Sequence, residues 1–115
     1  MSEGDAVLAY STSGKTREVL EMLELAHHLG VTAMIGITSH PDSSIHDLCP
    51  VVINMGEIIE PCVLGLTPTA STIVMLAISD ALALVLMEQK KISKKEFGLR
   101  HHGGYLGTKA NETNR

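Results

Sequence analysis

The sequence predicts an α/β protein with a parallel β-sheet. Three short apolar stretches of strand length are separated by two stretches whose apolar residues recur at helical spacing. Such alternation of strand and helix is typical of parallel sheets flanked by helices. The chain has 115 residues, enough for one domain, and 44% of them are hydrophobic against only 3% aromatic. We therefore expect a single aliphatic core.

The first strand is expected at Asp5–Tyr10, followed by a helix from about Thr16 to His28. In that helix the apolar residues share one face and the charged residues the other, as in an amphipathic surface helix. Gly30 supplies a stop just beyond it. The next stretch, Val31–Ile37, is apolar almost throughout, which favours a central parallel strand.

Turn residues occupy Thr38–Ser43, and Ser44 is positioned to cap a short helix that ends near Cys49. Val51–Ile53 predicts the third strand. Two glycines and two prolines interrupt Met55–Thr69, so we expect no regular structure there.

A long helix is expected from about Ser71 to Lys90. It is apolar nearly all round, which predicts a buried helix central to the packing. Its apolar run Ile73–Met87 has 15 residues, with Asp80 inside it. Because a bilayer-spanning helix needs about 20 residues and rarely carries a central Asp, we predict no membrane span.

A last short helix is expected after Ser93, with Glu96 three residues later completing a capping box. The polar residues Thr108–Arg115 are predicted to form a disordered tail.

Composition narrows the class of function. The net charge is −4, and no basic run appears, so nucleic acid is not expected as a partner. The two cysteines, Cys49 and Cys62, have neither metal-binding nor disulfide-framework spacing. Two reduced thiols are typical of a cytoplasmic protein.

The turn after the first strand carries the strongest functional signal. Ser11–Thr16 holds four hydroxyls, one Gly and one Lys, directly before a helix. A helix needs only one capping hydroxyl, so the others are surplus to that role. Hydroxyls and free N–H groups at a helix N-terminus favour an anion, and the sequence therefore predicts a phosphate site.

A nucleotide-binding P-loop is the competing interpretation. Residues 9–16 match its pattern at every fixed position except the first, where Ala9 replaces Gly. A Cβ there hinders close wrapping of the β-phosphate. In addition, no later strand ends in an Asp able to hold Mg²⁺. An NTPase or phosphotransferase is therefore the weaker hypothesis.

Three segments in order resemble the SIS (sugar isomerase) domain family. Ser11–Thr16 is similar to its S-x-S-G-x-[ST] phosphate loop. Cys62–Thr72 resembles the C-x-L-G-L-x-P-T-x-S-T segment of the arabinose-5-phosphate isomerases in that family, and Arg100–Gly107 resembles their S-H-P-G-G-x-L-G segment. The likeness covers residues 5–107, so we expect residues 1–107 to be the C-terminal part of one SIS domain.

This resemblance implies a flavodoxin-like sheet sandwiched by helices, in a homo-oligomer that binds a phosphosugar. It implies interconversion of D-arabinose 5-phosphate and D-ribulose 5-phosphate, a reaction that serves lipopolysaccharide or capsule synthesis. That chemistry requires no cofactor or metal. The pairs His27-His28 and His101-His102 lack further ligands at metal-site spacing, which agrees with the absence of a metal.

The resemblance also assigns residues to the site. The phosphate-binding residues it implies are Ser11, Thr12, Ser13, Gly14 and Thr16, with the hydroxyls of the serines and Thr16 and the backbone N–H groups of Thr12 and Gly14 as donors. Lys15 stands where the family often has Glu, and it either adds charge to the phosphate site or points into solvent.

Three residues are the catalytic candidates: Glu18, Glu60 and His101 match acidic and imidazole residues of the isomerases. Isomerisation needs a base and a proton shuttle. Glu60 lies in an irregular, apolar-flanked segment, where we expect a raised pKa suited to a base. An imidazole such as that of His101 suits ring opening or proton shuttling. His102 stands where the family usually has Pro.

The family's front half has no counterpart here, because Met1 precedes what resembles the second strand of an SIS domain. We therefore expect a fragment, or a chain completed by another copy or by a separate front-half polypeptide. A non-catalytic phosphosugar-binding module remains the alternative function.

Overall fold

The computed structural model describes residues 1–101 and 103–112, arranged in two compact units, Met1–Ala77 and Ile78–Arg115. The elements in order are β1 (Ala6–Tyr10), α1 (Arg17–His28), β2 (Ala33–Thr38), α2 (Ile45–Leu48), β3 (Val51–Asn54), α3 (Ala70–Gln89), α4 (Lys94–Arg100) and α5 (Tyr105–Asn111). All but the last match the elements that the sequence predicts, within a few residues at each end.

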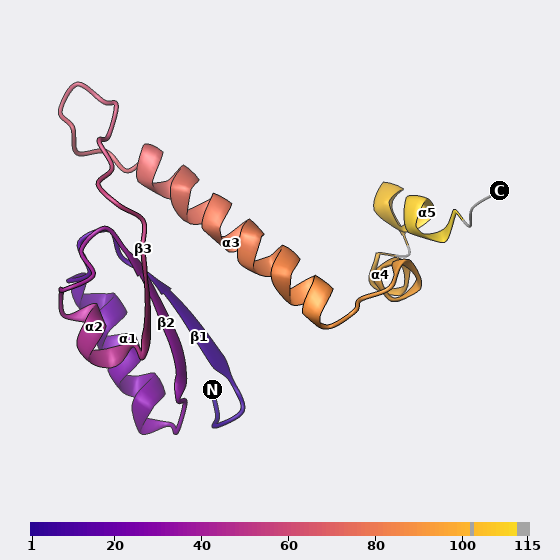
Figure 1. Cartoon of the computed structure of the whole chain (residues 1–115), viewed down its shortest axis with the longest axis horizontal. Helices are drawn as coiled ribbons and strands as arrows, with labels where there is room; N and C mark the ends of the chain where they lie inside the picture. The colour runs from indigo at the N-terminus through magenta and orange to yellow at the C-terminus, as the bar shows by residue number, and fades with distance from the viewer. Residues whose placement is uncertain (102, 113–115) are drawn as a thin grey trace. The chain divides into compact units, whose positions relative to one another are not determined.

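The first unit holds a three-stranded parallel sheet in the order β1-β2-β3, which confirms the α/β class (Figure 1). Tyr10 pairs with Ile37, and Thr38 pairs with Asn54, so the three strands end at the same edge of the sheet. In parallel α/β sheets, ligands bind outside this carboxyl edge. The segment that holds the hydroxyls, residues 11–16, leaves from it.

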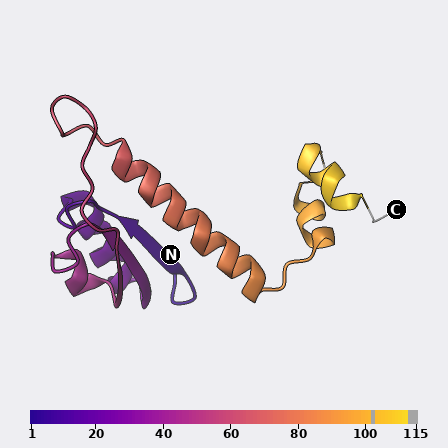
Figure 2. The same cartoon turned by 45° about the horizontal axis from the view of Figure 1, so that its top comes forward.

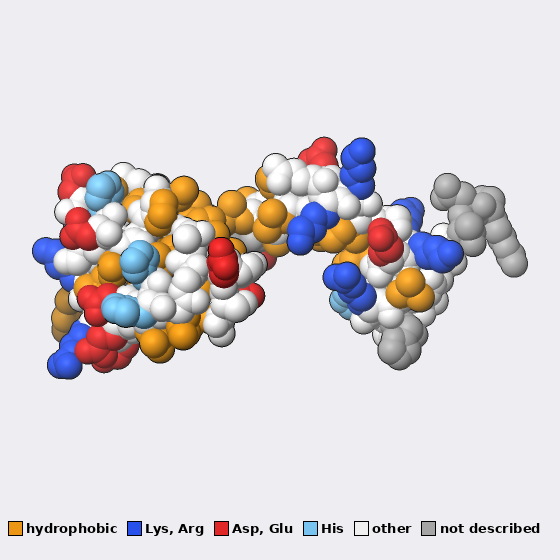
Figure 3. All heavy atoms as spheres, turned by 90° about the horizontal axis from the view of Figure 1, so that it is seen from below, with side chains coloured by type: hydrophobic (Ala, Val, Ile, Leu, Met, Phe, Trp, Pro, Cys, Tyr) orange, Lys and Arg blue, Asp and Glu red, His pale blue; other side chains and the backbone are white. Residues whose placement is uncertain are grey.

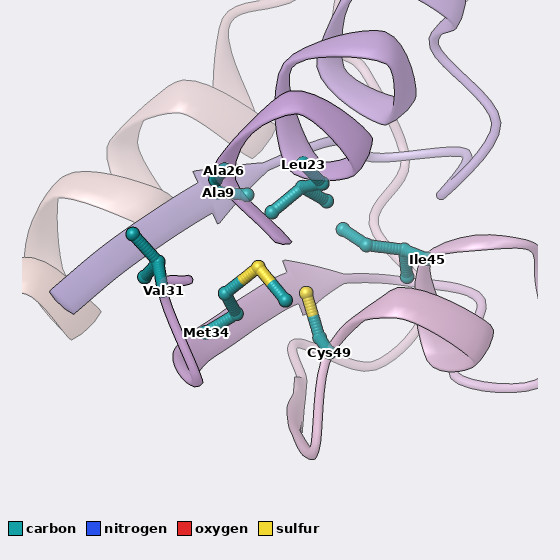
Figure 4. Close-up of a cluster of buried hydrophobic side chains, with 7 residues drawn as sticks. All are labelled: Ala9, Leu23, Ala26, Val31, Met34, Ile45 and Cys49. Carbon is teal, nitrogen blue, oxygen red and sulfur yellow. The ribbon is translucent and has the colours of Figure 1, made fainter. Parts of the chain in front are cut away.

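The core of this unit lies between the sheet and the helices α1 and α2, which contact its strands (Figure 4). Aliphatic and sulfur-containing side chains fill it: Ala9, Leu23, Ala26, Val31, Met34, Ile45 and Cys49. The amphipathic pattern of α1 explains this arrangement, because Leu23 and Ala26 are fully buried while the charged residues face solvent. Gly30, at φ 86°, ends the helix as the sequence predicts.

The long helix α3 corrects the prediction of a buried central helix. Only Ser71 is buried along its length, and large apolar side chains such as Ile73, Leu76 and Leu84 are more than 60% exposed. Within its own unit, neither part of α3 packs extensively against another helix or strand of the described residues. By length and composition α3 could cross a membrane, with mean hydropathy 2.1 and 6% of the stretch buried. Hydrophobic side chains at the molecular surface are visible in Figure 3.

The second unit contains α4 and α5, which pack against each other (Figure 2). The predicted capping box is present: the Ser93 hydroxyl accepts the Glu96 N–H at 3.2 Å, and the Glu96 carboxylate accepts the Ser93 N–H at 2.8 Å. The predicted disorder of residues 108–115 is wrong as far as Asn111, which ends α5. Buried Gly98 lets α5 approach, because a Cβ there would lie 2.6 Å from Asn111 Oδ1. Residues 113–115 lie outside the described residues.

Candidate functional site

The hydroxyl-bearing turn, residues 11–16, folds around a hydrogen bond between two of its own side chains. Ser11 Oγ and Thr16 Oγ1 lie 2.8 Å apart, and the Thr16 N–H also donates to Ser11 Oγ at 3.4 Å. Ser11 is buried. The other side chains of the turn are exposed: Thr12, Ser13, Lys15 and Thr16. The turn therefore has a buried anchor and an open, hydroxylated outer surface.

Thr16 is the N-cap residue of α1, yet its side chain caps no helical N–H. Because its hydroxyl is bonded to Ser11 instead, the first-turn N–H groups of α1 lack a side-chain partner. In the described part of the chain, the N–H groups of Thr12 and Ser13 also make no hydrogen bond. Unpaired donors at the positive end of a helix dipole are what an anion site requires.

Gly14 plays a different part from the one expected. Its N–H donates to the Ser11 carbonyl at 3.0 Å, so in this arrangement it is used within the turn rather than left open for a phosphate. Its conformation matters instead: φ is +64°, and a Cβ would lie 1.7 Å from Ser43 Oγ. Only glycine allows this close approach between the turn and the β2–α2 connection.

Two charged residues lie in or just after the turn. Lys15 and Glu18 are both exposed, with Glu18 in the first turn of α1. Arg17 pairs with Glu21 at 2.7 Å along the helix surface, so its charge is already balanced. Glu18 makes no ion pair among the described residues and stands beside the open N–H groups. Its position is compatible with either a catalytic role or stabilisation of the helix dipole.

The predicted base Glu60 is held by the start of α3. Its Oε2 accepts hydrogen bonds from the N–H groups of Thr69 and Ala70 at 2.9 and 2.8 Å, and its Oε1 accepts from the Ser71 N–H at 3.2 Å. A hydrogen bond from the Ser71 side chain contributes most, and together with the bonds from Thr69 and Ala70 it lowers the pKa of Glu60 from 4.5 to about 2. The expected raised pKa is therefore wrong, because these hydrogen-bond donors, the Ser71 side chain first among them, outweigh the effect of desolvation.

The same segment holds a thiol to which the sequence assigned no role. Cys62 Sγ accepts hydrogen bonds from the N–H groups of Leu66 and Thr67 at 3.4 and 3.3 Å. The Thr67 side chain contributes most, and together the donors lower the pKa of Cys62 from 9.0 to about 6. The lowered pKa of Cys62 could not be predicted from the sequence, because it depends on the backbone conformation of residues 62–67.

His101 lies in the second unit, at the C-cap of α4. Its ring stacks on Phe97, with centroids 4.1 Å apart, and its Nδ1 lies 3.0 Å from the Phe97 carbonyl. Since a carbonyl only accepts, Nδ1 is the donor in this bond, and Nε2 makes no hydrogen bond among the described residues. A cavity of about 460 Å³ adjoins it, lined also by Arg100 and by residues 103–106. The predicted difference at His102 lies outside the described residues.

A second cavity, which the sequence did not predict, lies beside the hydroxyl-bearing turn. Its volume is about 410 Å³, and residues 39–43 line it together with Ser13 and Lys15. His40 and Asp42 stand there, at the end of β2. The sequence did hold a signal for this cavity. Polar residues that follow a strand next to β1 lie at the same edge of the sheet as the hydroxyl-bearing turn.

The turn and Glu18 thus share one segment of the first unit. No hydrogen bond or ion pair among the described residues joins Glu60 to that segment. Within residues 1–101 and 103–112, no cluster of three metal-ligating side chains occurs.

The family model of the SIS domain matches residues 1–85. The chain belongs to the SIS domain family. This match covers the sheet, the hydroxyl-bearing turn and most of α3. It confirms the family that the three sequence segments indicated.

Curated relatives and solved structures of the SIS family agree with this membership. The chain is 38% identical to arabinose 5-phosphate isomerase KdsD of Pseudomonas aeruginosa over 93% of its length, and 37% identical to that of Escherichia coli over 91%. It spans about a third of each of these proteins, 32% in both cases.

Among solved structures, a Bacteroides fragilis protein assigned as a phosphosugar isomerase of capsule formation matches 91% of the chain with TM-score 0.84 and 42% identity. An Escherichia coli protein in complex with arabinose 5-phosphate matches 88% with TM-score 0.80 and 35% identity. The chain covers 55% and 53% of these two structures.

Proposed function

We propose that this SIS chain serves an aldose–ketose isomerase that interconverts D-arabinose 5-phosphate and D-ribulose 5-phosphate. The observation that carries the proposal is the open set of donors at the start of α1: the hydroxyls of the turn and the unpaired N–H groups of Thr12 and Ser13. The activity for which the curated relatives are named supports the choice of sugar.

The turn suits a phosphate monoester in charge and in hydrogen bonding. A monoester is a dianion near neutral pH with three acceptor oxygens, whereas the turn presents donors at a positive helix end. Ser13, Thr16 and the Thr12 N–H would bind the oxygens, with Ser11 holding Thr16 in place. Lys15, exposed on the same turn, adds a positive charge.

The reaction moves protons and leaves the carbon skeleton unchanged. A base removes the proton on C2 of the aldose and returns it to C1, while the C2 hydroxyl proton passes to the C1 oxygen. His101 is our candidate for the hydroxyl proton, because Nε2 of its ring makes no hydrogen bond among the described residues. Glu18 is the candidate base. Glu60 stays ionised down to about pH 2, and we assign it to holding the segment that follows β3 and to fixed negative charge.

Thr16→Val tests the phosphate site with little change in volume. We expect the thermal stabilisation of the chain by D-arabinose 5-phosphate to disappear in this variant. Thr32→Val is the matched control, because Thr32 is an exposed threonine outside the helices and strands. Equal stabilisation of Thr16→Val and the unaltered chain would contradict the assignment of this turn.

Turnover is followed by ³¹P and ¹H NMR on the same samples. Conversion that His101→Ala abolishes supports the isomerase. Stabilisation without conversion favours the non-catalytic phosphosugar-binding module instead. Stabilisation by Mg-ATP that is lost in Lys15→Ala would favour the nucleotide hypothesis.

We further propose that more SIS-domain polypeptide covers α3, from another copy or another stretch of chain. The support is its exposed apolar surface and the extent of the solved relatives, of which this chain covers 55% and 53%. We also propose a cytoplasmic location, which the two free thiols support.

A further inference from the structure

The cavity between the hydroxyl-bearing turn and residues 39–43 is a preformed feature of the first unit. Its volume of about 410 Å³ lies within the range of small-molecule sites. Ser13 and Lys15 form one side, and the β2–α2 connection forms the other. Both sides belong to the segments that leave the carboxyl edge of the sheet.

Hydrogen bonds fix the two sides of the cavity to each other. The Thr12 carbonyl accepts from Thr38 Oγ1 and from the Ser39 N–H, both at 3.1 Å. The Ile45 N–H donates to the Gly14 carbonyl at 3.0 Å. Because these bonds join the segment before the cavity to the segment after it, its walls cannot separate without breaking them. A ligand would therefore find the site already formed.

The lining is polar and carries side chains of both charges. Lys15 supplies a cation, Asp42 an anion and His40 an imidazole, and Ser13 adds a hydroxyl. The connection between residues 39 and 43 is itself held by bonds from the Ser43 N–H and hydroxyl to the His40 carbonyl, at 3.1 and 2.5 Å. A second dianion would meet the Asp42 carboxylate, whereas sugar hydroxyls can both donate to Asp42 and accept from Lys15.

One further atom points to an incomplete hydrogen-bond network at this wall. Ser39 Oγ is buried, and among the described residues it has no hydrogen-bond partner. Buried hydroxyls are normally paired, so such an atom next to a cavity indicates that a partner belongs there when the site is filled.

We propose that this cavity receives the hydroxylated carbon chain of the phosphosugar, and that His40 and Asp42 determine which sugar is accepted. The inference rests on the proposed function, because the phosphate must first be held by the adjoining turn. Ser13 and Lys15 belong to both sites, so a phosphate at the turn has its attached carbon chain next to the cavity mouth. His40 and Asp42 then discriminate through hydrogen bonds to sugar hydroxyls.

The test compares two ligands that share the phosphate and differ in the carbon chain. Affinities for D-arabinose 5-phosphate and for inorganic phosphate are measured by calorimetry on the full chain, for Asp42→Asn and His40→Ala. We expect each variant to weaken arabinose 5-phosphate binding roughly tenfold and to leave phosphate binding within about twofold. Asp47→Asn and His46→Ala are the matched controls, since both residues are exposed on α2 outside the cavity lining.

Two results would overturn the cavity proposal while leaving the proposed function intact. Unchanged affinity for arabinose 5-phosphate in both variants would show that the carbon chain lies elsewhere. An equal loss for phosphate and phosphosugar would show that the residues act only on the shape of the turn. If the unaltered chain binds neither ligand, the phosphate site itself is wrong, and the cavity assignment is rejected with it.

Discussion

Glu60 Oε2 accepts hydrogen bonds from both the backbone N–H and the Oγ1 of Thr69, at 2.9 and 3.0 Å. The same oxygen also accepts from the Ala70 N–H, at the first residue of α3. The Glu60 carboxylate thus caps the N-terminus of α3 although it lies about ten residues earlier in the sequence. These bonds close residues 60–69 into a loop. This explains why a predicted catalytic base instead has a strongly lowered pKa.

The pH dependence of stability should reveal this cap. Because the folded-state pKa of about 2 lies below the ordinary value of 4.5, Glu60 stabilises the fold above about pH 4.5. That contribution is lost as the pH falls from 4.5 towards 2. Glu60→Gln should remove this part of the acid dependence, as measured by amide hydrogen exchange at residues 69–71. Glu57→Gln is the control, since Glu57 accepts no hydrogen bond among the described residues.

Cys62 should react with iodoacetamide as a thiolate well below the usual pH. With a pKa of about 6, its alkylation rate should reach half its maximum near pH 6. Cys49 is 3% exposed and its pKa is raised by burial, so it should stay unmodified until the chain unfolds. Thr67→Val should shift the Cys62 profile to higher pH, because Thr67 is the main donor. An unshifted profile would contradict the hydrogen-bonded thiolate.

Gly14→Ala should destabilise the first unit severely. Its φ of +64° costs an L-residue about 1 kcal/mol, and collision with Ser43 Oγ adds about 1–3 kcal/mol. Gly65→Ala separates the two effects, because Gly65 has the same φ of +64° and no atom within 4 Å of the place that a Cβ would occupy. Urea unfolding of both variants measures the difference. Equal losses would mean that the contact between the turn and Ser43 is not tight.

The aliphatic core predicts a contrast between two leucines of the same helix. Leu23 is fully buried in the cluster between the sheet and its helices, whereas Leu25 is 55% exposed. Leu23→Ala should lower the free energy of unfolding by about 2–5 kcal/mol through lost burial and a cavity. Leu25→Ala should change it by no more than about 0.5 kcal/mol. Similar values for the two would contradict the orientation of α1.

The apolar surface of α3 should make the chain associate. We expect sedimentation velocity to show self-association that grows with concentration, because Leu76 and Leu84 are 62% and 66% exposed. The double variant Leu76→Glu, Leu84→Glu should reduce it. Leu25→Glu is the control, as an exposed leucine on α1. A monomer at all concentrations would contradict the proposal that another copy of this chain covers α3.

Local structure and family membership could be predicted from the order of the residues alone. The strand, turn and helix at residues 5–28 follow from apolar periodicity and from Gly30, which are properties of neighbouring residues. The capping box of Ser93 and Glu96 is local in the same sense. The segment Ser11–Thr16 also carried enough chemistry to indicate a phosphate site.

Hydrogen bonds and contacts between segments far apart in the sequence could be identified only from the tertiary structure. Glu60 became a cap because Thr69–Ser71 folds back upon it, and its pKa depends on those donors rather than on its sequence neighbours. Gly14 lies so close to Ser43 that no Cβ fits between them. The pairing of β1 with β2 places His40 beside the turn. The prediction that α3 is buried was wrong. The apolar pattern of a helix shows which side chains could be buried, whereas their actual burial depends on whether another surface packs against them.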